Sequence, residues 1–309
     1  MQPLISLVIL GYQNFDRVTL PCLESLAPWF SDLEIEVIIV DNGSDDGSAE
    51  KTRLWCAKHT RLTCHLSKTN LGFAGGMNWG ASHAHGKWLF LVNNDTIFPD
   101  KAIDALKLVL LQAPHNVAMI GPVTNAAGNG QRLWKPEATH IQWLEIGRWL
   151  HEHPTKLLMP TYRCDFFCIA IRSDVWVRLS GLDTSFGLGY YEDFDFSLRL
   201  RSLGFDQKIS EDVFILHLGS ASFQASKSAR DLMKRNKIRL KSKHPSASFE
   251  HTRLGNLAVL EEYSNIKKKG GWGEDLSRRE QLRKGALIGD APRSTFKKWL
   301  WNRKIKRFY

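Results

Sequence analysis

The sequence predicts an α/β protein, with a mostly parallel sheet flanked by helices and a helical, basic C-terminal extension. Short apolar runs rich in β-branched residues recur along the first 217 residues, and helix-like segments separate them. Strands connected through helices pair in parallel, with right-handed crossovers. The C-terminal extension also differs from the rest of the chain in its charge. Residues 265–309 hold 14 Lys and Arg and 4 Asp and Glu, whereas residues 1–219 hold 19 Lys and Arg and 24 Asp and Glu.

The strands are predicted from their composition and the helices from their boundaries. Segments 4–10 and 35–40 are short, mostly apolar runs, which are typical of strands buried on both faces. Pro21 falls in the first turn of a helix between them, where its missing N–H costs little. Turn-forming residues follow the second strand at 41–48. The expected strands are 4–10, 35–40, 62–66, 87–92, 117–120, 166–171 and 213–217, and the expected helices are 17–29, 49–59, 70–84, 100–112, 173–179 and about 190–204.

The rest of the chain is less regular. Residues 121–136 are rich in Gly and Asn and predict a long loop, which is uncommon unless it serves a function. Beyond residue 226 only helical patterns are visible, with a Gly-rich break at 270–273. We therefore expect one domain over residues 1–225, with a division near residue 121, and a separate extension over residues 226–309.

Several protein classes are excluded by composition. No apolar run approaches the roughly 18 residues that span a bilayer. The run 4–10 has no preceding Lys or Arg and no cleavage site, so we do not expect a signal peptide. Five cysteines in 309 residues do not form a disulfide framework, and Cys164 and Cys168 lack a second pair for a zinc site. A cytoplasmic protein is expected.

Acidic residues and one histidine stand where the predicted elements begin or end. Asp95 follows a buried strand, a place where a carboxylate can bind a divalent cation or merely cap a turn. Glu192 and Asp193 lie at a helix start, where acids serve either chemistry or N-terminal capping. His217 ends the last strand, and a single histidine is more often structural than a ligand.

The glycines at 72, 75 and 76 follow neither the spacing of a dinucleotide fingerprint nor that of a P-loop. They precede a helix whose free N–H groups suit a phosphate or a ribose.

Taken in order, these segments resemble inverting family 2 glycosyltransferases, which have the Rossmann-like GT-A fold. The similarity is greatest to the rhamnosyltransferase-like and galactofuranosyltransferase-like branch and covers roughly residues 4–225. Any one motif is weakly specific, whereas their shared order is highly specific. The matching segments are Ser6–Asn14, Ile38–Ser48, Asn70–Asn78, Leu91–Thr96, Gly181–Phe186, Tyr191–Asp195 and His217.

The resemblance implies a role for each matching residue. Asp41 would bind the pyrimidine base, and Asp193 would be the catalytic base. The segment Asn93-Asn94-Asp95 matches the DXD motif with Asn at its first position, which leaves one carboxylate for a metal. His217 would be the other metal ligand, with Mn²⁺ favoured over Mg²⁺ for a site of mixed nitrogen and oxygen ligands. The residues expected to line the donor are Asn70, Gly72, Asn78, Asn93 and Asn94.

The expected reaction moves a sugar from a nucleoside diphosphate to a hydroxyl of a glycan or glycolipid, with inversion, in the synthesis of cell-surface polysaccharide such as lipopolysaccharide. The branch favours dTDP-rhamnose, with UDP-hexose or UDP-galactofuranose as alternatives. A nucleotidylyltransferase and a catalytically inactive glycan-binding scaffold are the other hypotheses. Aromatic faces suit sugar rings, and the acceptor is expected near Tyr191, Glu192, Trp134 and Asn125.

The basic extension predicts contact with the cytoplasmic face of a membrane. On a helix, Trp301, Ile305 and Phe308 share one face beside many Lys and Arg, as in helices that lie on anionic lipid. A lipid-linked acceptor would make this contact useful. Basic and aromatic residues also suit nucleic acid, a partner that we do not expect, and a solvated tail or an oligomer contact is the remaining alternative.

Overall fold

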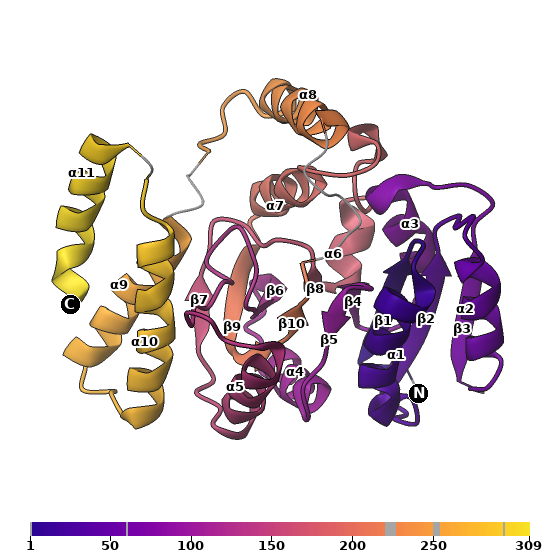
Figure 1. The fold of residues 1–309 in the computed structure, drawn as a ribbon, viewed down its shortest axis with the longest axis horizontal. Helices are drawn as coiled ribbons and strands as arrows, with labels where there is room; N and C mark the ends of the chain where they lie inside the picture. The colour runs from indigo at the N-terminus through magenta and orange to yellow at the C-terminus, as the bar shows by residue number, and fades with distance from the viewer. Residues whose placement is uncertain (1, 60, 220–226, 250–253, 293) are drawn as a thin grey trace.

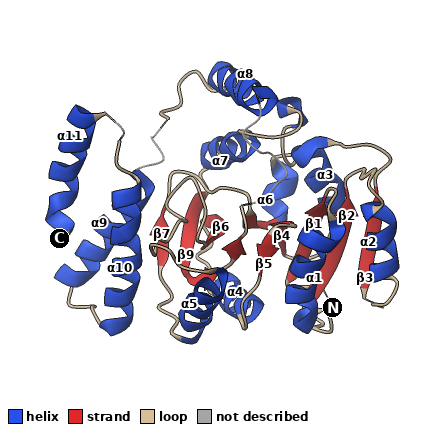
Figure 2. Cartoon of the chain, in the orientation of Figure 1, coloured by secondary structure: helices blue, strands red, loops and turns tan. Residues whose placement is uncertain are grey.

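The computed structural model describes residues 2–59, 61–219, 227–249, 254–292 and 294–309. Its centre is an eight-stranded sheet in the order β3-β2-β1-β4-β8-β6-β9-β7, with helices on both faces (Figures 1 and 2). The strands are β1 (Ile5–Gly11), β2 (Ile35–Asp41), β3 (Leu62–Leu66), β4 (Trp88–Asn93), β5 (Thr96–Ile97), β6 (Val117–Val123), β7 (Leu158–Pro160), β8 (Cys168–Arg172), β9 (Asp206–Phe214) and β10 (Leu216–His217). The helices are η1 (Phe15–Thr19), α1 (Leu20–Leu26), η2 (Ala27–Trp29), α2 (Ser48–Cys56), α3 (Gly72–Ala81), α4 (Ala102–Leu111), α5 (His140–Glu152), α6 (Ser173–Arg178), η3 (Thr184–Phe186), α7 (Glu192–Ser202), α8 (Lys227–Lys243), α9 (Leu254–Lys268), α10 (Glu274–Gly289), α11 (Thr295–Ile305) and η5 (Lys306–Phe308).

Alternate residues of the central strands point to opposite faces of the sheet and bury two cores. Leu7 and Ile9 of β1 belong to the core that α1 and α4 cover, whereas Val8 and Leu10 belong to the core that α3, α6 and α7 cover. Burial on both faces explains why the first strands are mostly apolar and not alternating.

The predicted mostly parallel sheet is confirmed. Strands β3, β2, β1 and β4 pair in parallel, as do β6 and β9. Two strands run the other way: β8 is antiparallel to β4 and β6, and β7 is antiparallel to β9. The first residues of β8 therefore lie at the same edge as the last residues of β4, where Val92 pairs with Cys168.

Several elements differ from the predictions. The expected helix 17–29 is divided into η1, α1 and η2, although Pro21 does lie in the first turn of α1. Helix α5 and strand β7 lie in a part of the chain for which no element was predicted. The expected strand 213–217 is the end of β9 followed by β10, which pairs with β5.

Helix α8 packs directly on α7, although the predicted boundary placed it in a separate extension. Asn236 of α8 is buried and donates to the backbone oxygens of Phe186 and Gly189, at 2.7 and 2.8 Å. Lys243 Nζ lies 2.7 Å from a carboxylate oxygen of Asp195, which is itself fully buried. A boundary at residue 225 therefore separates elements that form one packed structure.

Helices α9, α10 and α11 form a layer beside β7 and β9 (Figure 1). Trp301, Ile305 and Phe308 are only 6%, 6% and 7% exposed, and they belong to a core shared with α5 and β9. Trp301 Nε1 donates to the backbone oxygen of Leu287 at 3.0 Å. The prediction that these three residues face a lipid surface is wrong, because their apolar face binds the rest of the protein. Among the described residues, no helix is both long and apolar enough to cross a membrane.

Candidate active site

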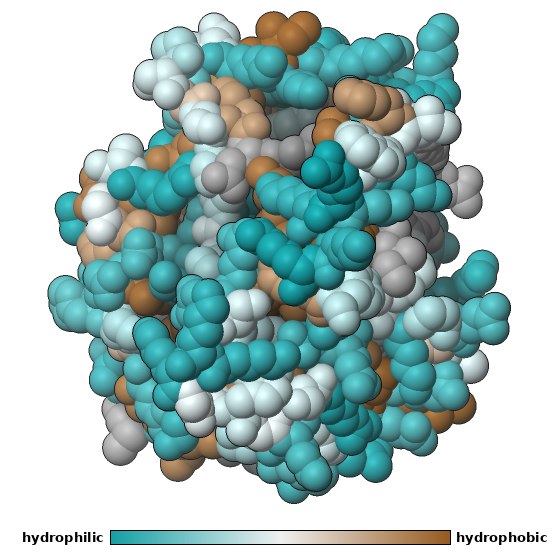
Figure 3. All heavy atoms as spheres, turned by 90° about the vertical axis from the view of Figure 1, so that its left-hand side faces the viewer, coloured by the Kyte–Doolittle hydropathy of each residue, from teal (hydrophilic) through white to brown (hydrophobic). Residues whose placement is uncertain are grey.

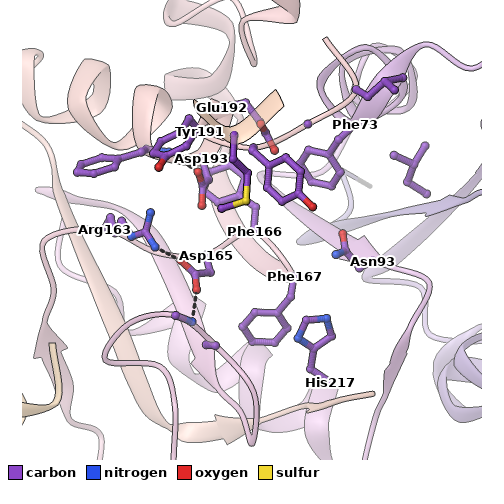
Figure 4. Close-up of a pocket in the computed structure, with 18 of the residues that line it drawn as sticks. Phe73, Asn93, Arg163, Asp165, Phe166, Phe167, Tyr191, Glu192, Asp193 and His217 are labelled. Atoms are coloured by element: carbon purple, nitrogen blue, oxygen red, sulfur yellow. Dashed lines mark hydrogen bonds and ion pairs between the residues drawn. The ribbon is translucent and has the colours of Figure 1, made fainter. Parts of the chain in front are cut away.

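A cavity of about 1020 Å³ opens at the sheet edge where the parallel strands end. This volume is at the upper limit for small-molecule sites and can hold more than one ligand. Eight of the predicted site residues line it: Asn70, Asn93, Asn94, Asp95, Tyr191, Glu192, Asp193 and His217. Figure 4 shows Tyr191, Glu192 and Asp193 along one side of the cavity and His217 on the opposite side.

Asp95 and His217 meet because β5 and β10 pair, with His217 opposite Thr96. His217 Nε2 lies 3.3 Å from Asp95 Oδ2, and both residues are largely buried. The other ring nitrogen, Nδ1, lies 2.9 Å from the backbone oxygen of Ala126, and the ring stacks on Phe167 with centroids 5.2 Å apart. Burial alone would lower the pKa of His217, but the Asp95 carboxylate outweighs this and raises the pKa.

The amide side chains near this pair are held by short-range contacts. Asn94 Nδ2 donates to Thr19 Oγ1 at 2.8 Å, so Asn94 fixes the turn after β4 against η1. Asn70 Oδ1 accepts from the backbone N–H of Gly72 at 2.8 Å and from Asn42 Nδ2 at 3.2 Å. These contacts shape the end of the cavity formed by β1, β2 and α3.

The acidic pair Glu192 and Asp193 begins α7 after a strained turn. Tyr190 and Tyr191 both have left-handed backbone conformations, with φ of 72° and 77°. Such conformations cost non-glycine residues of the order of 1–3 kcal/mol and cluster at functional sites. Asn236 of α8 supports the turn by donating to its backbone oxygens.

Burial raises the pKa of both acids. The pKa of Asp193 is raised to about 6 by burial, with Arg163 opposing the shift. The pKa of Glu192 is raised further by burial and by the charge of Asp193, and Glu192 Oε2 has no hydrogen-bond partner among the described residues. Near neutral pH the pair therefore holds one carboxylate, at Asp193, beside one protonated acid.

Arg163 and Asp165 complete this side of the cavity, and neither was predicted. Arg163 Nη2 lies 3.1 Å from Asp165 Oδ1, and the guanidinium stacks over the Phe194 ring at 5.2 Å. Asp165 Oδ2 accepts from the backbone N–H of Gly128 at 2.6 Å, which binds the loop after β6 to the start of β8 (Figure 4). Arg163 thus provides positive charge next to Asp193 without a direct ion pair to it.

Five predicted site residues do not line the cavity. Asp41 accepts from Ser44, with Ser44 Oγ 2.7 Å from Oδ2, so its carboxylate orders the loop after β2. Asn78 exchanges two 2.8 Å hydrogen bonds with the backbone of Leu182, which joins α3 to the segment before η3. Gly72 has a φ of +72°, and a Cβ there would come within 2.3 Å of a neighbouring backbone oxygen.

The other two lie on the loop after β6. Asn125 makes paired hydrogen bonds to the backbone of His217, at 2.8 and 2.9 Å, and so positions the histidine. Trp134 packs against α10, where its backbone N–H donates to the oxygen of Leu282 at 3.1 Å. The expectation that Trp134 forms an acceptor wall is not supported by this position.

The pair of Asp95 and His217 fits a site for a divalent cation that a substrate completes. Among the described residues, no group of three or more His, Cys, Asp or Glu side chains could hold a metal ion. Mn²⁺ and Mg²⁺ in phosphate sites, however, commonly use one or two protein ligands together with phosphate oxygens. Contact of Nδ1 with the Ala126 oxygen would direct Nε2 toward the cation, as in many metal-binding histidines.

Part of this chain is similar in sequence to known glycosyltransferases. A model of the family described as "Glycosyl transferase family 2" matches residues 6–177. The Glycosyltransferase GlyG of Streptococcus pneumoniae serotype 4 is 30% identical over 106 residues, which are 34% of this chain and 35% of that protein. The chain thus aligns with about a third of that relative's length.

Two solved structures share the fold. One is the mannosyltransferase PcManGT from Pyrobaculum calidifontis in complex with GDP-Man and Mn²⁺, with a TM-score of 0.57 and 16% sequence identity. The alignment covers 99% of this chain and 86% of the PcManGT chain. The other is GalNAc-T7 with UDP, GalNAc and Mn²⁺, with a TM-score of 0.56 and 12% sequence identity. That alignment covers 78% of this chain and 48% of the GalNAc-T7 chain. At these identities the similarity establishes the fold, and the predicted GT-A architecture is confirmed.

Proposed function

Because the chain belongs to glycosyl transferase family 2, we propose that it transfers a sugar from a nucleoside diphosphate to an acceptor hydroxyl with inversion at the anomeric carbon. The observation that carries the proposal is the arrangement of one cavity, in which Figure 4 shows His217 and Asp193 on opposite sides and Asp95 lies 3.3 Å from His217. The pair of Asp95 and His217 suits a diphosphate and its cation, and Asp193 suits an acceptor hydroxyl.

Asp193 acts as the general base. Its carboxylate accepts the proton of the attacking hydroxyl while the nucleoside diphosphate leaves from the opposite face of the sugar. Burial and the charge of Asp193 raise the pKa of Glu192, so Asp193 is the single ionised base of the pair, an arrangement that suits a single displacement with inversion. Phe166 and Phe167 line the cavity and exclude water that would otherwise hydrolyse the donor.

A divalent cation held by Asp95 and His217 would offset the negative charge of the leaving diphosphate. Asn93, at the first DXD position, lines the cavity without adding a carboxylate. We therefore expect a site with two protein ligands. PcManGT and GalNAc-T7, the structures of similar fold, contain Mn²⁺.

The donor is proposed to be dTDP-rhamnose, on the resemblance of segment 70–76 to that branch of the family. UDP-hexose and UDP-galactofuranose remain the alternatives. The acceptor is proposed to be a glycan or lipid-linked glycan of a cell-surface polysaccharide. Tyr191 and Glu192 line the cavity next to the base and are the proposed acceptor contacts.

The test measures nucleoside diphosphate release from dTDP-rhamnose, UDP-glucose, UDP-galactofuranose and GDP-mannose, with and without Mn²⁺. The variant Asp193→Asn is expected to lose at least about 100-fold in kcat and still bind the nucleoside diphosphate. Asp174→Asn, on the exposed surface of α6, is the control. Wild-type turnover by Asp193→Asn would refute the base assignment, and absence of binding to any nucleoside diphosphate by the folded protein would refute the function.

The metal site has its own test. His217→Ala is expected to abolish the increase in nucleoside diphosphate affinity that Mn²⁺ produces, measured by calorimetry. His153→Ala is the control, since His153 is exposed on the far end of α5. An unchanged Mn²⁺ effect in His217→Ala would return this histidine to a structural role.

Peripheral contact with the cytoplasmic membrane face remains part of the proposal, on a different face of α11 from the one predicted. Phe296, Trp299 and Leu300 are 67%, 52% and 46% exposed, and Arg303 stacks over Trp299 at 4.9 Å. Figure 3 shows the side of the molecule formed by the C-terminal helices as mainly hydrophilic, with separate hydrophobic patches. Such a mixture of basic and aromatic side chains suits anionic lipid headgroups.

Vesicle flotation tests this contact. The double variant Phe296→Ser and Trp299→Ser is expected to lose binding to phosphatidylglycerol vesicles, whereas Ile141→Ser, an exposed change on α5, retains it. Failure of the wild-type protein to bind these vesicles would remove the membrane from the proposal.

A further inference from the structure

One wall of the cavity comes from α8, which the sequence placed outside the catalytic domain. Met233, Lys237, Leu240 and Lys241 line the cavity, and their spacing of three and four residues places them on one face of the helix. Leu240 lies on the same side of α8 as Asn236 and packs in one core with Phe194 and Leu198 of α7, so the cavity residues adjoin the face that packs on α7. Helix α8 therefore contributes two cations to a site whose other charged groups lie on the sheet and on α7.

The position of this wall is fixed by buried contacts. Asn236 donates to three backbone oxygens of the turn before α7. Lys243 Nζ lies 2.7 Å from both Asp183 and Asp195, and His244 Nε2 lies 2.8 Å from Asp195. These contacts join α8 to the helix that bears the base, so the two cavity lysines are presented by a rigid element.

The basic residues of α8 differ in whether an acidic side chain pairs with them. Lys234 lies 3.9 Å from Asp231, and Lys243 is paired with two carboxylates. Neither Lys237 nor Lys241 forms an ion pair or hydrogen bond with any residue of the described ranges. Two lysines four residues apart on a helix repel each other unless an anion lies between them.

We propose that Lys237 and Lys241 bind a diphosphate group of a substrate at the α8 wall of the cavity. The proposal rests on the function given above, in which one substrate carries a diphosphate. Lysine ammonium groups bind phosphate as point charges, and two lysines four residues apart on a helix can approach the same anionic group from one side. The diphosphate belongs either to the nucleotide donor or to a lipid-linked acceptor, and Met233 and Leu240 give the wall an apolar surface that suits the latter.

The experiment is calorimetry on the full chain, with and without Mn²⁺, using Lys237→Gln, Lys241→Gln, and the double variant. Lys234→Gln is the matched control, because Lys234 lies on the same helix but does not line the cavity. The probes are dTDP, UDP and GDP for the donor, the corresponding nucleosides, and farnesyl diphosphate for a lipid-linked acceptor. Because both lysines are exposed, the thermal unfolding midpoint is expected to stay unchanged.

Each single substitution is expected to weaken binding about tenfold, equivalent to about 1.4 kcal/mol. A donor diphosphate is identified if the double variant loses affinity for a nucleoside diphosphate but not for its nucleoside. An acceptor diphosphate is identified if only farnesyl diphosphate binding is lost. Unchanged affinity for every diphosphate probe would overturn the proposal. If the wild-type protein binds farnesyl diphosphate but no nucleoside diphosphate, the proposed function fails while the lysine site stands.

Discussion

The buried ion pair between α10 and β9 offers a quantitative test of how the C-terminal helices are attached. The side chains of Arg283 and Glu211 are 0% and 1% exposed. Arg283 also donates to the backbone oxygen of Gly130 and, at 2.9 Å, to Asn256 Oδ1. The substitution Arg283→Leu would leave a buried carboxylate without its charge partner, although Tyr263 still donates to Glu211 at 2.7 Å.

Breaking a buried ion pair by removing one partner costs about 3–5 kcal/mol. The whole free energy of unfolding of a typical protein is about 5–15 kcal/mol, so the loss is a large share. At about 2–4 °C per kcal/mol for a chain of this size, the thermal midpoint is expected to fall by about 6–20 °C. The helices would therefore contribute strongly to the stability of the domain that carries the active site.

The assay is urea unfolding followed by circular dichroism. Arg278→Leu is the control on the same helix, because Arg278 is exposed and its main contact is with the Trp149 ring at 4.1 Å, so about 1 kcal/mol or less is expected. The double variant Glu211→Leu and Arg283→Leu is expected to be more stable than Arg283→Leu alone, since no unpaired charge remains. An Arg283→Leu protein as stable as wild type would refute the buried pairing.

Three further outcomes are expected. The value of kcat/KM is expected to rise as the pH passes through about 6, the pKa of Asp193, because only the ionised carboxylate accepts a proton; a rise centred near pH 4 would contradict this. Gly72→Ala is expected to destabilise the protein by more than 1 kcal/mol in urea unfolding, whereas Gly273→Ala, which meets no atom within 4 Å, is expected to have little effect. Asn236→Ala is expected to lower kcat, because the turn before Asp193 loses the hydrogen bonds that support it. The control Asn265→Ala changes an exposed residue and is expected to keep full kcat. Equal activity of the two variants would show that α8 does not position this turn.

The first half of the fold was readable from sequence because its strands are buried on both faces. Mostly apolar runs and the turn residues that follow them located β1, β2 and β4. The same signals placed Asp95 at the cavity, since ligands bind beyond the carboxyl ends of parallel strands, whereas Asp193 and His217 were assigned from the resemblance to the family. Helix α5 also has a start signal in the sequence, because Thr139 is its N-cap residue and forms a capping box with Gln142, the third residue of the helix.

The direction of strand β8 cannot be predicted from its sequence, and for this reason part of the site was not predicted. Because β8 is antiparallel, residues that precede it lie at the cavity, so Arg163 and Asp165 were missed. The direction of a strand depends on its connection through distant elements and leaves no pattern in its own residues. In the same way, Trp301 and Ile305 form an amphipathic face on any helix, and only tertiary structure shows that the face meets protein and not lipid.

The reversal at β8 also brings two groups of site residues together at one edge of the sheet. Strands β1, β2 and β4 present the residues proposed for the donor, whereas β8 and α7 present those proposed for the acceptor. Only five residue pairs, from Trp88–Arg172 to Val92–Cys168, join β4 to β8. Further connections join the two groups of residues: His217 of β10 pairs with β5 beside Asp95, and Asn78 of α3 is hydrogen-bonded to the backbone of Leu182. The spacing between the leaving group and the attacking hydroxyl is therefore held by several backbone and side-chain connections together.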